Sequence, residues 1–557
     1  MCFVSFVWRQ LEFAFFGAAT SVVALFVCTG ENKKEENKML KKIFILCTIC
    51  LAFSLVITSC SAKNKEDKIT VSEDGYVVVN GVKTEYKAHV HEYGEWRVVS
   101  EATKSEDGVM EQSCSCGDKK SQKVEKTGSI GLVYIFESDT KEATLSSLGT
   151  CVDTEIVIPE MINDYKVTKI AKEAFYNNKT VTSVVIGDNV TSIPNDAFRN
   201  CTALANVKIG NSVKVIGDNA FNGCTEVVGI KIPDSVTDIK SFAFYNCLKV
   251  SELSLGNGIV SIGESAFQGI DRVFNLTIPD SVTIIGNNAF KNFSRLITLK
   301  LGSNLQNIGS QAFMGCKITE LVIPDSVTLM GDGAFRDCTL ISKLTLSKNL
   351  SEIPANAFYN CTSITSVIIP DKVITIGDSA FNSCTILESV SIPEGVVTIE
   401  NAAFRNCKGL KKVTIPSTVT SIGESAFNGC ESLSDLAILG KIADIKYLAF
   451  SNTAIKNVII PDGVTYIARD ALAGCKELEW VVIPSSVKTI IYGSFNASGL
   501  NTVYYGGSES EWKQISISYD YNAPLKSAVK YYYSESAPEA EGNFWHYVDG
   551  VPTVWSN

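Results

Sequence analysis

The sequence is poor in the residues on which most catalytic and nucleic-acid-binding sites depend. It holds only three histidines in 557 residues, and 50 Lys and Arg against 60 Asp and Glu give a net charge of −10. Nucleic-acid binders concentrate positive charge on one face, so this balance argues against a nucleic-acid partner. It argues equally against attachment to a membrane through a polybasic surface.

The three histidines, His89, His91 and His546, all lie outside residues 150–505. A Ser-His-Asp or Cys-His catalytic arrangement is therefore excluded from that region, and the chain has no Gly-rich phosphate-binding loop. We expect no catalytic residues, no cofactor and no enzymatic activity. An exported enzyme is an alternative that would need its active site in residues 69–128 or 506–557.

Metal ligands are scarce as well. The candidates for zinc are His89, His91, Cys114 and Cys116. Structural zinc sites more often have two residues between the cysteines of a pair, and here there is one. We expect no bound metal, with zinc at these four residues as the alternative.

The apolar run from Ile43 to Ile57 is too short for a comfortable transmembrane helix. It follows the basic segment Met39-Leu40-Lys41-Lys42 and fits a secretory signal. Its end, Ile57-Thr58-Ser59-Cys60, resembles a bacterial lipoprotein lipobox, which implies that Cys60 carries a diacylglycerol and becomes the mature N-terminus. We assign residues 39–60 to a lipoprotein signal peptide and 61–68 to a linker, with an uncleaved anchor as the alternative.

Residues 1–38 are interpreted as an upstream extension, with translation starting at Met39. Glu35-Glu36 lies shortly before that Met, where its codons would form a purine-rich ribosome-binding site. The apolar stretch from Phe13 to Val27 makes a genuine transmembrane segment the alternative.

An internal repeat dominates the rest of the chain. A Phe, almost always preceded by Ala, returns every 23 residues apart from two steps of 22, and Leu takes its place once. The fifteen positions are Phe175, Phe198, Phe221, Phe244, Phe267, Phe290, Phe313, Phe335, Phe358, Phe381, Phe404, Phe427, Phe450, Leu472 and Phe495.

One copy shows the expected local structure. Val207-Lys208-Ile209 alternates apolar and polar residues, which predicts a strand that ends at Gly210. Ile216-Gly217 is interpreted as a second turn, and Asp218 to Phe221 as a polar cap that opens about one helical turn.

A single copy is too small to fold. Seven apolar side chains contribute about 10–20 kcal/mol even if fully buried. Ordering 23 residues costs about 35 kcal/mol. Stability must therefore come from stacking each copy on its neighbours.

The unit Ile-Pro-Asp-Ser-Val-Thr, followed by Ile-Gly, Ala-Phe and Cys, occurs at Ile278–Phe290 and Ile323–Cys338. It resembles the BspA-like (Treponema-type) leucine-rich repeats over about residues 150–505. The resemblance implies a curved solenoid on a bacterial cell surface, with a parallel sheet on its concave face, adhesion to host or matrix proteins, and no catalytic residues. The predicted fold is mostly β with short helical turns, in about fifteen repeats of 23 residues, with small β modules at the ends.

The predicted domain boundaries follow from this pattern. They are a small β module at 69–128, an N-terminal cap at 129–155, the solenoid at 156–505, and a C-terminal cap with an aromatic hairpin tail at 506–557. Asp549-Gly550, between aromatic and β-branched residues, predicts the turn of that hairpin.

Ten of the 18 cysteines follow the repeat Phe or Leu by three residues. Consecutive copies fall into groups of three, six and one, so pairing between neighbours cannot satisfy all of them. We expect reduced thiols that act as small buried hydrophobes.

Solenoids usually bind through the strand face. The outward strand position is mildly basic in the N-terminal half, with Lys208, Lys231 and Lys300. Near its end an apolar patch is predicted as the ligand-binding site. Its members are Ile459, Trp480, Val482 and Tyr504. The alternative is that the C-terminal cap covers these residues.

These features predict a lipid-anchored protein on the outer face of a bacterial cell that binds an extracellular protein or glycoprotein of a host, a matrix or a neighbouring cell. It would contact the membrane only through its lipid. A structural spacer that displays the terminal modules is the alternative.

Overall fold

The computed structural model describes residues 69–71, 76–79, 81–87, 93–100, 104, 107–124, 128–518, 520–539 and 541–556. They belong to two compact units, of which the first comprises residues up to Tyr93 with Cys114–Asp118, and the second Gly94–Ser113 with everything from Lys119 onward. Cys60, the predicted signal peptide and residues 1–38 lie outside the described residues, as do His89 and His91.

Two small antiparallel sheets precede the repeats. The first contains β1 (Ile69–Val71), β2 (Tyr76–Val79) and β3 (Val82–Lys87). The second contains β4 (Arg97–Ser100), β5 (Gly108–Ser113) and β6 (Lys119–Val124).

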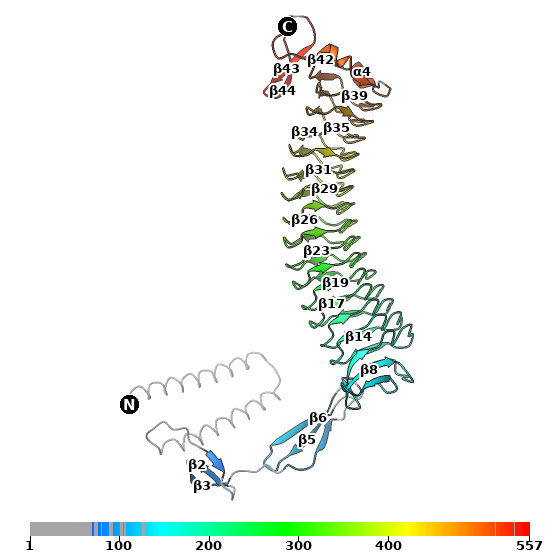
Figure 1. Ribbon diagram of the computed structural model, residues 1–557, viewed down its shortest axis with the longest axis vertical. Coiled ribbons are helices and arrows are strands. Elements are labelled where there is room, and N and C mark those ends of the chain that lie inside the picture. Colours follow the sequence, from blue (N-terminus) through cyan, green and yellow to red (C-terminus); the bar gives the residue numbers. More distant parts are fainter. Residues whose placement is uncertain are drawn as a thin grey trace, which may run out of the picture. The chain divides into compact units, whose positions relative to one another are not determined.

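The repeats form stacked coils, each with two strands (Figure 1). The longer strands pair in parallel with their counterparts in neighbouring coils, and we call this set the long-strand ladder. Its members are β9 (Glu155–Ile158), β12 (Ser183–Ile186), β14 (Asn206–Lys208), β16 (Gly229–Lys231), β18 (Glu252–Ser254), β20 (Asn275–Thr277), β22 (Thr298–Lys300), β24 (Glu320–Val322), β26 (Lys343–Thr345), β28 (Ser366–Ile368), β30 (Ser389–Ser391), β32 (Lys412–Ile415), β34 (Asp435–Ile438), β36 (Asn457–Ile459), β38 (Trp480–Ile483) and β40 (Thr502–Tyr505).

The second strand of each coil has two residues, and these strands form the short-strand ladder. Val215–Ile216, for example, pairs in parallel with Ser192–Ile193 and Asp238–Ile239. The turn predicted at Ile216-Gly217 is therefore wrong at Ile216, which lies in a strand. The members are β13 (Ser192–Ile193), β15 (Val215–Ile216), β17 (Asp238–Ile239), β19 (Ser261–Ile262), β21 (Ile284–Ile285), β23 (Asn307–Ile308), β25 (Leu329–Met330), β27 (Glu352–Ile353), β29 (Thr375–Ile376), β31 (Thr398–Ile399), β33 (Ser421–Ile422), β35 (Asp444–Ile445), β37 (Tyr466–Ile467), β39 (Thr489–Ile490) and β41 (Ser516–Ile517).

The N-terminal edge of the short-strand ladder is covered by a hairpin. β7 (Val133–Glu137) and β8 (Glu142–Ser147) are antiparallel, and β8 pairs in parallel with β11 (Tyr165–Ile170), which leads to β13. β10 (Met161–Ile162) also pairs with β11. Covering an open edge in this way prevents it from pairing with another chain.

The third side of each coil, here named the turn side, differs from the predicted helical turn. Asn219 has φ 55°, a left-handed value that a right-handed helix does not allow. Its amide donates a hydrogen bond to the carbonyl of Ser241 in the next coil at 3.0 Å, and the amide of Phe221 donates to Ala243 at 2.7 Å. The helical turn predicted at Asp218 to Phe221 is therefore wrong, because these amides bond to the next coil.

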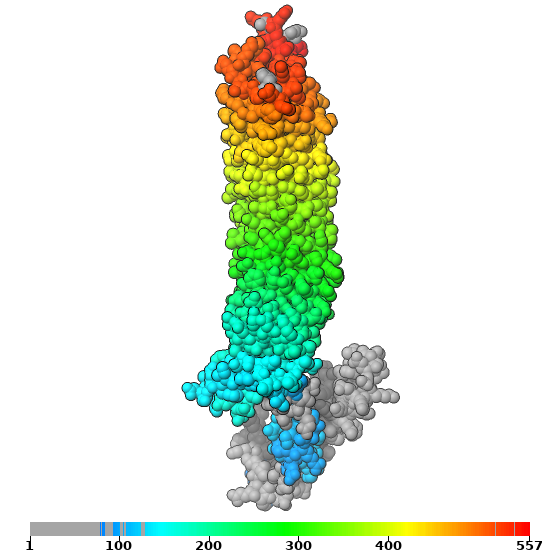
Figure 2. Space-filling model, turned by 90° about the vertical axis from the view of Figure 1, so that its right-hand side faces the viewer, coloured from blue at the N-terminus to red at the C-terminus, as the bar shows by residue number. Residues whose placement is uncertain are grey.

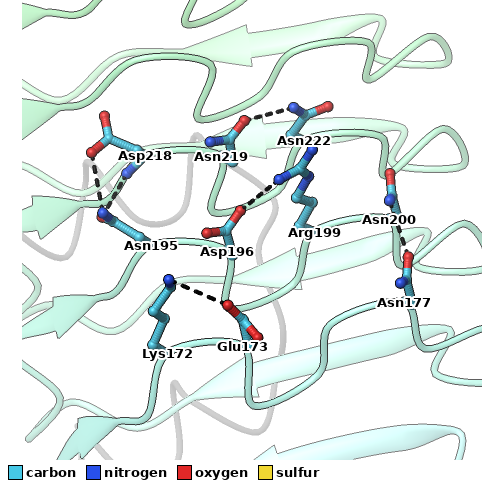
Figure 3. A network of polar contacts seen from close by, with 10 residues as sticks. All are labelled: Lys172, Glu173, Asn177, Asn195, Asp196, Arg199, Asn200, Asp218, Asn219 and Asn222. Atoms are coloured by element: carbon cyan, nitrogen blue, oxygen red, sulfur yellow. Dashed lines mark hydrogen bonds and ion pairs between the residues drawn. The ribbon is translucent and has the colours of Figure 1, made fainter.

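Polar side chains reinforce the turn side between coils (Figure 3). The Nδ2 of Asn200 donates to Oδ1 of Asn177 at 3.0 Å, 23 residues away. Asn195 donates in the same way to the carboxylate of Asp218 at 3.2 Å. The polar residues of the repeat therefore join neighbouring coils as the backbone does.

The core is a column of phenylalanine rings. Phe198 and Phe221, each fully buried, stack at a centroid distance of 5.1 Å with an interplanar angle of 2°. The stacking runs without a break from Phe175 to Phe450. Figure 2 shows the outside of the stacked coils as a continuous column. The predicted β-solenoid of coils of about 23 residues is confirmed, whereas the concave position of its sheet stays a prediction.

The ten repeat cysteines do more than fill space. Each Sγ–H donates a hydrogen bond to the backbone carbonyl of the Phe in the preceding coil, as Cys224 does to Phe198 at 3.0 Å and Cys407 to Phe381 at 3.2 Å. None of the thirteen cysteines that the structure describes is in a disulfide. The reduced state stays a prediction, which these hydrogen bonds support.

Stability should fall above about pH 8.5, where thiols of the unfolded chain titrate. Burial raises the pKa of Cys247, Cys338 and Cys384 to about 12. The unfolded chain then loses protons that the folded chain keeps, so each such thiol lowers the free energy of unfolding by about 1.4 kcal/mol per pH unit. Urea unfolding at increasing pH measures the slope. Cys384→Ser should make it shallower, and an unchanged slope would contradict this origin.

Candidate binding surfaces

The outward face of the long-strand ladder carries lysines without ion-pair partners. Lys208, Lys231 and Lys300 lie at equivalent strand positions, are exposed, and make no ion pair with another described residue. By contrast, Lys343 and Lys412 on the same face pair with acidic residues of adjacent coils, at 3.7 and 2.7 Å. The first three lysines are therefore available to a negatively charged partner.

A hollow lies on the same face. It has a volume of about 470 Å³ and is lined by Gly229, Lys231, Glu252 and Phe274 among others. Gly229 removes the side chain that neighbouring coils carry at this position, and the ladder is interrupted between β14 and β16 and again between β18 and β20. Phe274 remains 49% exposed at its rim. Sequence reasoning found the lysines but missed the hollow.

The predicted apolar patch is only partly present. Ile459 is 39% exposed and Trp480 and Tyr504 are half-buried, with their rings 5.8 Å apart. Val482 is only 3% exposed. The prediction that Val482 offers contact area to a ligand is therefore wrong.

The C-terminal tail packs against one member of this patch, Tyr504. β40 pairs with β42 (Val529–Tyr533), which pairs with β43 (Phe544–Val548). Trp545 on β43 is 1% exposed, lies 5.5 Å from the ring of Tyr504 and donates through Nε1 to the Tyr505 carbonyl at 2.8 Å. The alternative that the cap covers the patch therefore describes part of it correctly.

The cap contains the predicted hairpin turn. β43 and β44 (Val551–Val554) form this hairpin, with left-handed φ at Asp549 and Gly550. A short helix, α3 (Glu509–Trp512), begins with a capping box at Ser508. A second helix, α4 (Ala523–Ser527), follows.

A cluster of planar side chains that sequence reasoning missed lies on the turn side near the C-terminal end. Tyr447, Arg469 and Tyr492 occupy equivalent positions in successive coils, and Tyr521 continues the row. We call these four residues the arginine–tyrosine stack. The signal that could have found it is the spacing of 22 and 23 residues between the first three.

The repeats match a protein-family model. The model for the BspA type leucine-rich repeat region matches residues 168–294, 260–388 and 374–501, which together span more than half of the chain. The chain belongs to the BspA-type leucine-rich repeat family. The predicted resemblance is confirmed.

Solved structures that resemble the chain include leucine-rich repeat proteins of two bacteria. A leucine-rich repeat protein from Bacteroides ovatus ATCC 8483 is 25% identical, with 64% of this chain and 94% of that chain covered and a TM-score of 0.47. A leucine rich cell surface protein from Faecalibacterium prausnitzii A2-165 is 30% identical, with 70% and 97% covered and a TM-score of 0.36. None of the curated proteins compared with the chain matches it.

Among its described residues, this BspA-type protein contains no group of three or more His, Cys, Asp or Glu arranged to hold a metal ion. Its one described histidine, His546, stacks on Trp555 at 3.7 Å. No helix among the described residues has the length and apolar character to cross a membrane.

Proposed function

We propose that the protein is a lipid-anchored adhesin of the bacterial surface that binds an extracellular protein or glycoprotein through its long-strand face. The observation that carries the proposal is the set of lysines without ion-pair partners among the described residues, Lys208, Lys231 and Lys300, of which Lys231 lines the hollow at Gly229. Exposed charge beside an apolar rim such as Phe274 is the composition of a protein-binding surface.

Family membership fits this role. Its repeats form an interaction scaffold, and one similar solved protein is described as a cell surface protein. Binding rather than catalysis is therefore the proposed activity. Anchoring through a diacylglycerol on Cys60 is part of the proposal and rests on the lipobox pattern of the sequence.

Adhesion of cells that display the full chain tests the proposal. We expect them to adhere to host epithelial cells, immobilised matrix proteins or neighbouring bacteria more than cells without the protein. Replacing Lys208, Lys231 and Lys300 together by Gln should weaken binding about ten-fold, since three exposed charges contribute roughly 0.2–1 kcal/mol each. Surface plasmon resonance on the ligand found in this way measures the affinity.

The matched control removes three lysines that already have acidic partners, Lys343, Lys411 and Lys412. Equal loss of affinity in both triple variants would show a non-specific charge effect and contradict the assignment. Cys60→Ala should release the protein into the medium, whereas Cys50→Ala should not. Adhesion that survives exchange of residues 156–505 for an unrelated solenoid would favour the spacer.

A further inference from the structure

The arginine–tyrosine stack places a guanidinium between two aromatic rings. The Cζ of Arg469 is 5.9 Å from the ring centroid of Tyr447 and 5.5 Å from that of Tyr492. At the equivalent position, most earlier coils carry polar or acidic side chains, such as Asn195 and Asp218. Cation–π contacts on two sides restrict the guanidinium to the plane between the rings.

A carboxylate fixes the guanidinium further. The Nε–H of Arg469 donates to Oδ2 of Asp470 at 3.0 Å, and the Asp470 side chain is only 17% exposed. Gly493 in the next coil has φ 72°, and a Cβ there would overlap Oδ1 of Asp470. The missing side chain at Gly493 therefore leaves room for the carboxylate that orients Arg469.

The outer edge of the Arg469 guanidinium is accessible to a ligand. Its side chain is 61% exposed, and only one of the five N–H groups of the guanidinium has a partner among the described residues. The remaining N–H groups form a planar fork that matches the two oxygens of a carboxylate. Because the fork is already oriented, little conformational entropy is lost on binding.

Exposed rings lie at the two ends of the row that holds this fork. Tyr521 is 63% exposed and Tyr447 37% exposed. Tyr521 lies 4.9 Å from Tyr492, whose pKa is raised by burial and by its contact with the Tyr521 hydroxyl. Aromatic rings with hydroxyl groups at their tips offer an apolar surface to the C–H face of a sugar and hydrogen bonds to its hydroxyls.

We propose that the arginine–tyrosine stack binds a carboxylate-bearing sugar, with the carboxylate on the guanidinium of Arg469 and the sugar ring against the exposed tyrosines. This site lies on the turn side and is separate from the long-strand face, so it adds a second ligand class to the proposed protein binding. The carboxylate can come from a sialic acid or from a uronic acid.

Titration calorimetry on the chain that follows the predicted signal peptide tests the site with two acidic probes. Sialyllactose is compared with neutral lactose, and oligogalacturonate is compared with a neutral galactose oligosaccharide. We expect saturable binding of at least one acidic probe and none of its neutral counterpart. The probe that binds identifies the source of the carboxylate. Arg469→Lys keeps the charge but loses the fork and should weaken binding about ten-fold. Tyr521→Ala should weaken it about five-fold.

Arg336→Lys is the matched control. Arg336 also pairs with a neighbouring aspartate and lies 4.4 Å from the ring of Tyr359, but it has a ring on one side only. Its substitution should leave affinity unchanged, as should the triple lysine variant of the long-strand face. Failure of both acidic probes to bind the wild type, equal binding of the neutral sugars, or an equal loss with Arg336→Lys would overturn the proposal.

Discussion

Replacing Phe313 by Ala should lower the free energy of unfolding by about 3–5 kcal/mol, the usual cost of removing a buried aromatic ring. Phe313 is fully buried and stacks between Phe290 and Phe335 at centroid distances of 5.3 and 5.4 Å. The coils above and below are held at their spacing by the backbone ladders, so the space left by the ring cannot close. Urea unfolding followed by circular dichroism measures the change.

Phe274→Ala is the control for this substitution. It removes the same side chain from an exposed position outside the column, and its effect should stay below about 1 kcal/mol. In Phe313→Ala, hydrogen exchange should accelerate most in the coils next to the substitution, because each coil contacts only its neighbours. Equal destabilisation by the two variants would contradict a structural role for the stacked column.

The sequence predicted the coil and its longer strand because both depend on residues that recur. Val207 and Ile209 point inward on either side of Lys208, and the 23-residue spacing of Phe brings equivalent residues into register. The sequence does not predict the short-strand ladder, because its strands have two residues, too few to show an alternation of apolar and polar side chains. The sequence predicts a helical turn at Asn219, because a left-handed backbone conformation leaves no periodic pattern of side chains that would reveal it.

The candidate sites were harder to predict because they depend on contacts between distant segments. Val482 is buried, and the C-terminal tail returns to the ladder, where Trp545 packs on Tyr504 more than 40 residues away. The hollow at Gly229 arises where ladder pairing is interrupted, which no single repeat reveals. Lys231 was found because the outward position of each strand follows directly from the alternation.

The C-terminal end of the phenylalanine column depends on the side-chain amide of one asparagine. Within the array, amides of the turn side donate to carbonyls of the next coil, but Phe495 is the last repeat Phe, and the chain above it does not repeat the Ala-Phe unit. The N–H of Phe495 instead donates to Oδ1 of Asn522 at 2.8 Å. The Nδ2 of Asn522 donates to the carbonyls of Ile491 and Ser518 at 2.8 and 2.6 Å, and the residue is fully buried. The side chain of Asn522 therefore supplies the acceptor that a backbone carbonyl of the next coil supplies to the earlier phenylalanines.

Asn522→Leu should lower the free energy of unfolding of the C-terminal coils by about 2 kcal/mol or more. The substitution keeps the volume but leaves the amide of Phe495 and the carbonyl of Ser518 without partners, at about 1–3 kcal/mol for each group that stays buried and unsatisfied, whereas the carbonyl of Ile491 still accepts from Ser494. Hydrogen exchange at the Phe495 amide and urea unfolding report the loss. Asn496→Leu is the matched control, because the side chain of Asn496 makes no hydrogen bond with another described residue. Equally slow exchange of the Phe495 amide in Asn522→Leu and Asn496→Leu would contradict this role of Asn522. Another group would then have to accept the hydrogen bond of the Phe495 amide, because an unprotected last coil would expose its amides to water or to a second chain.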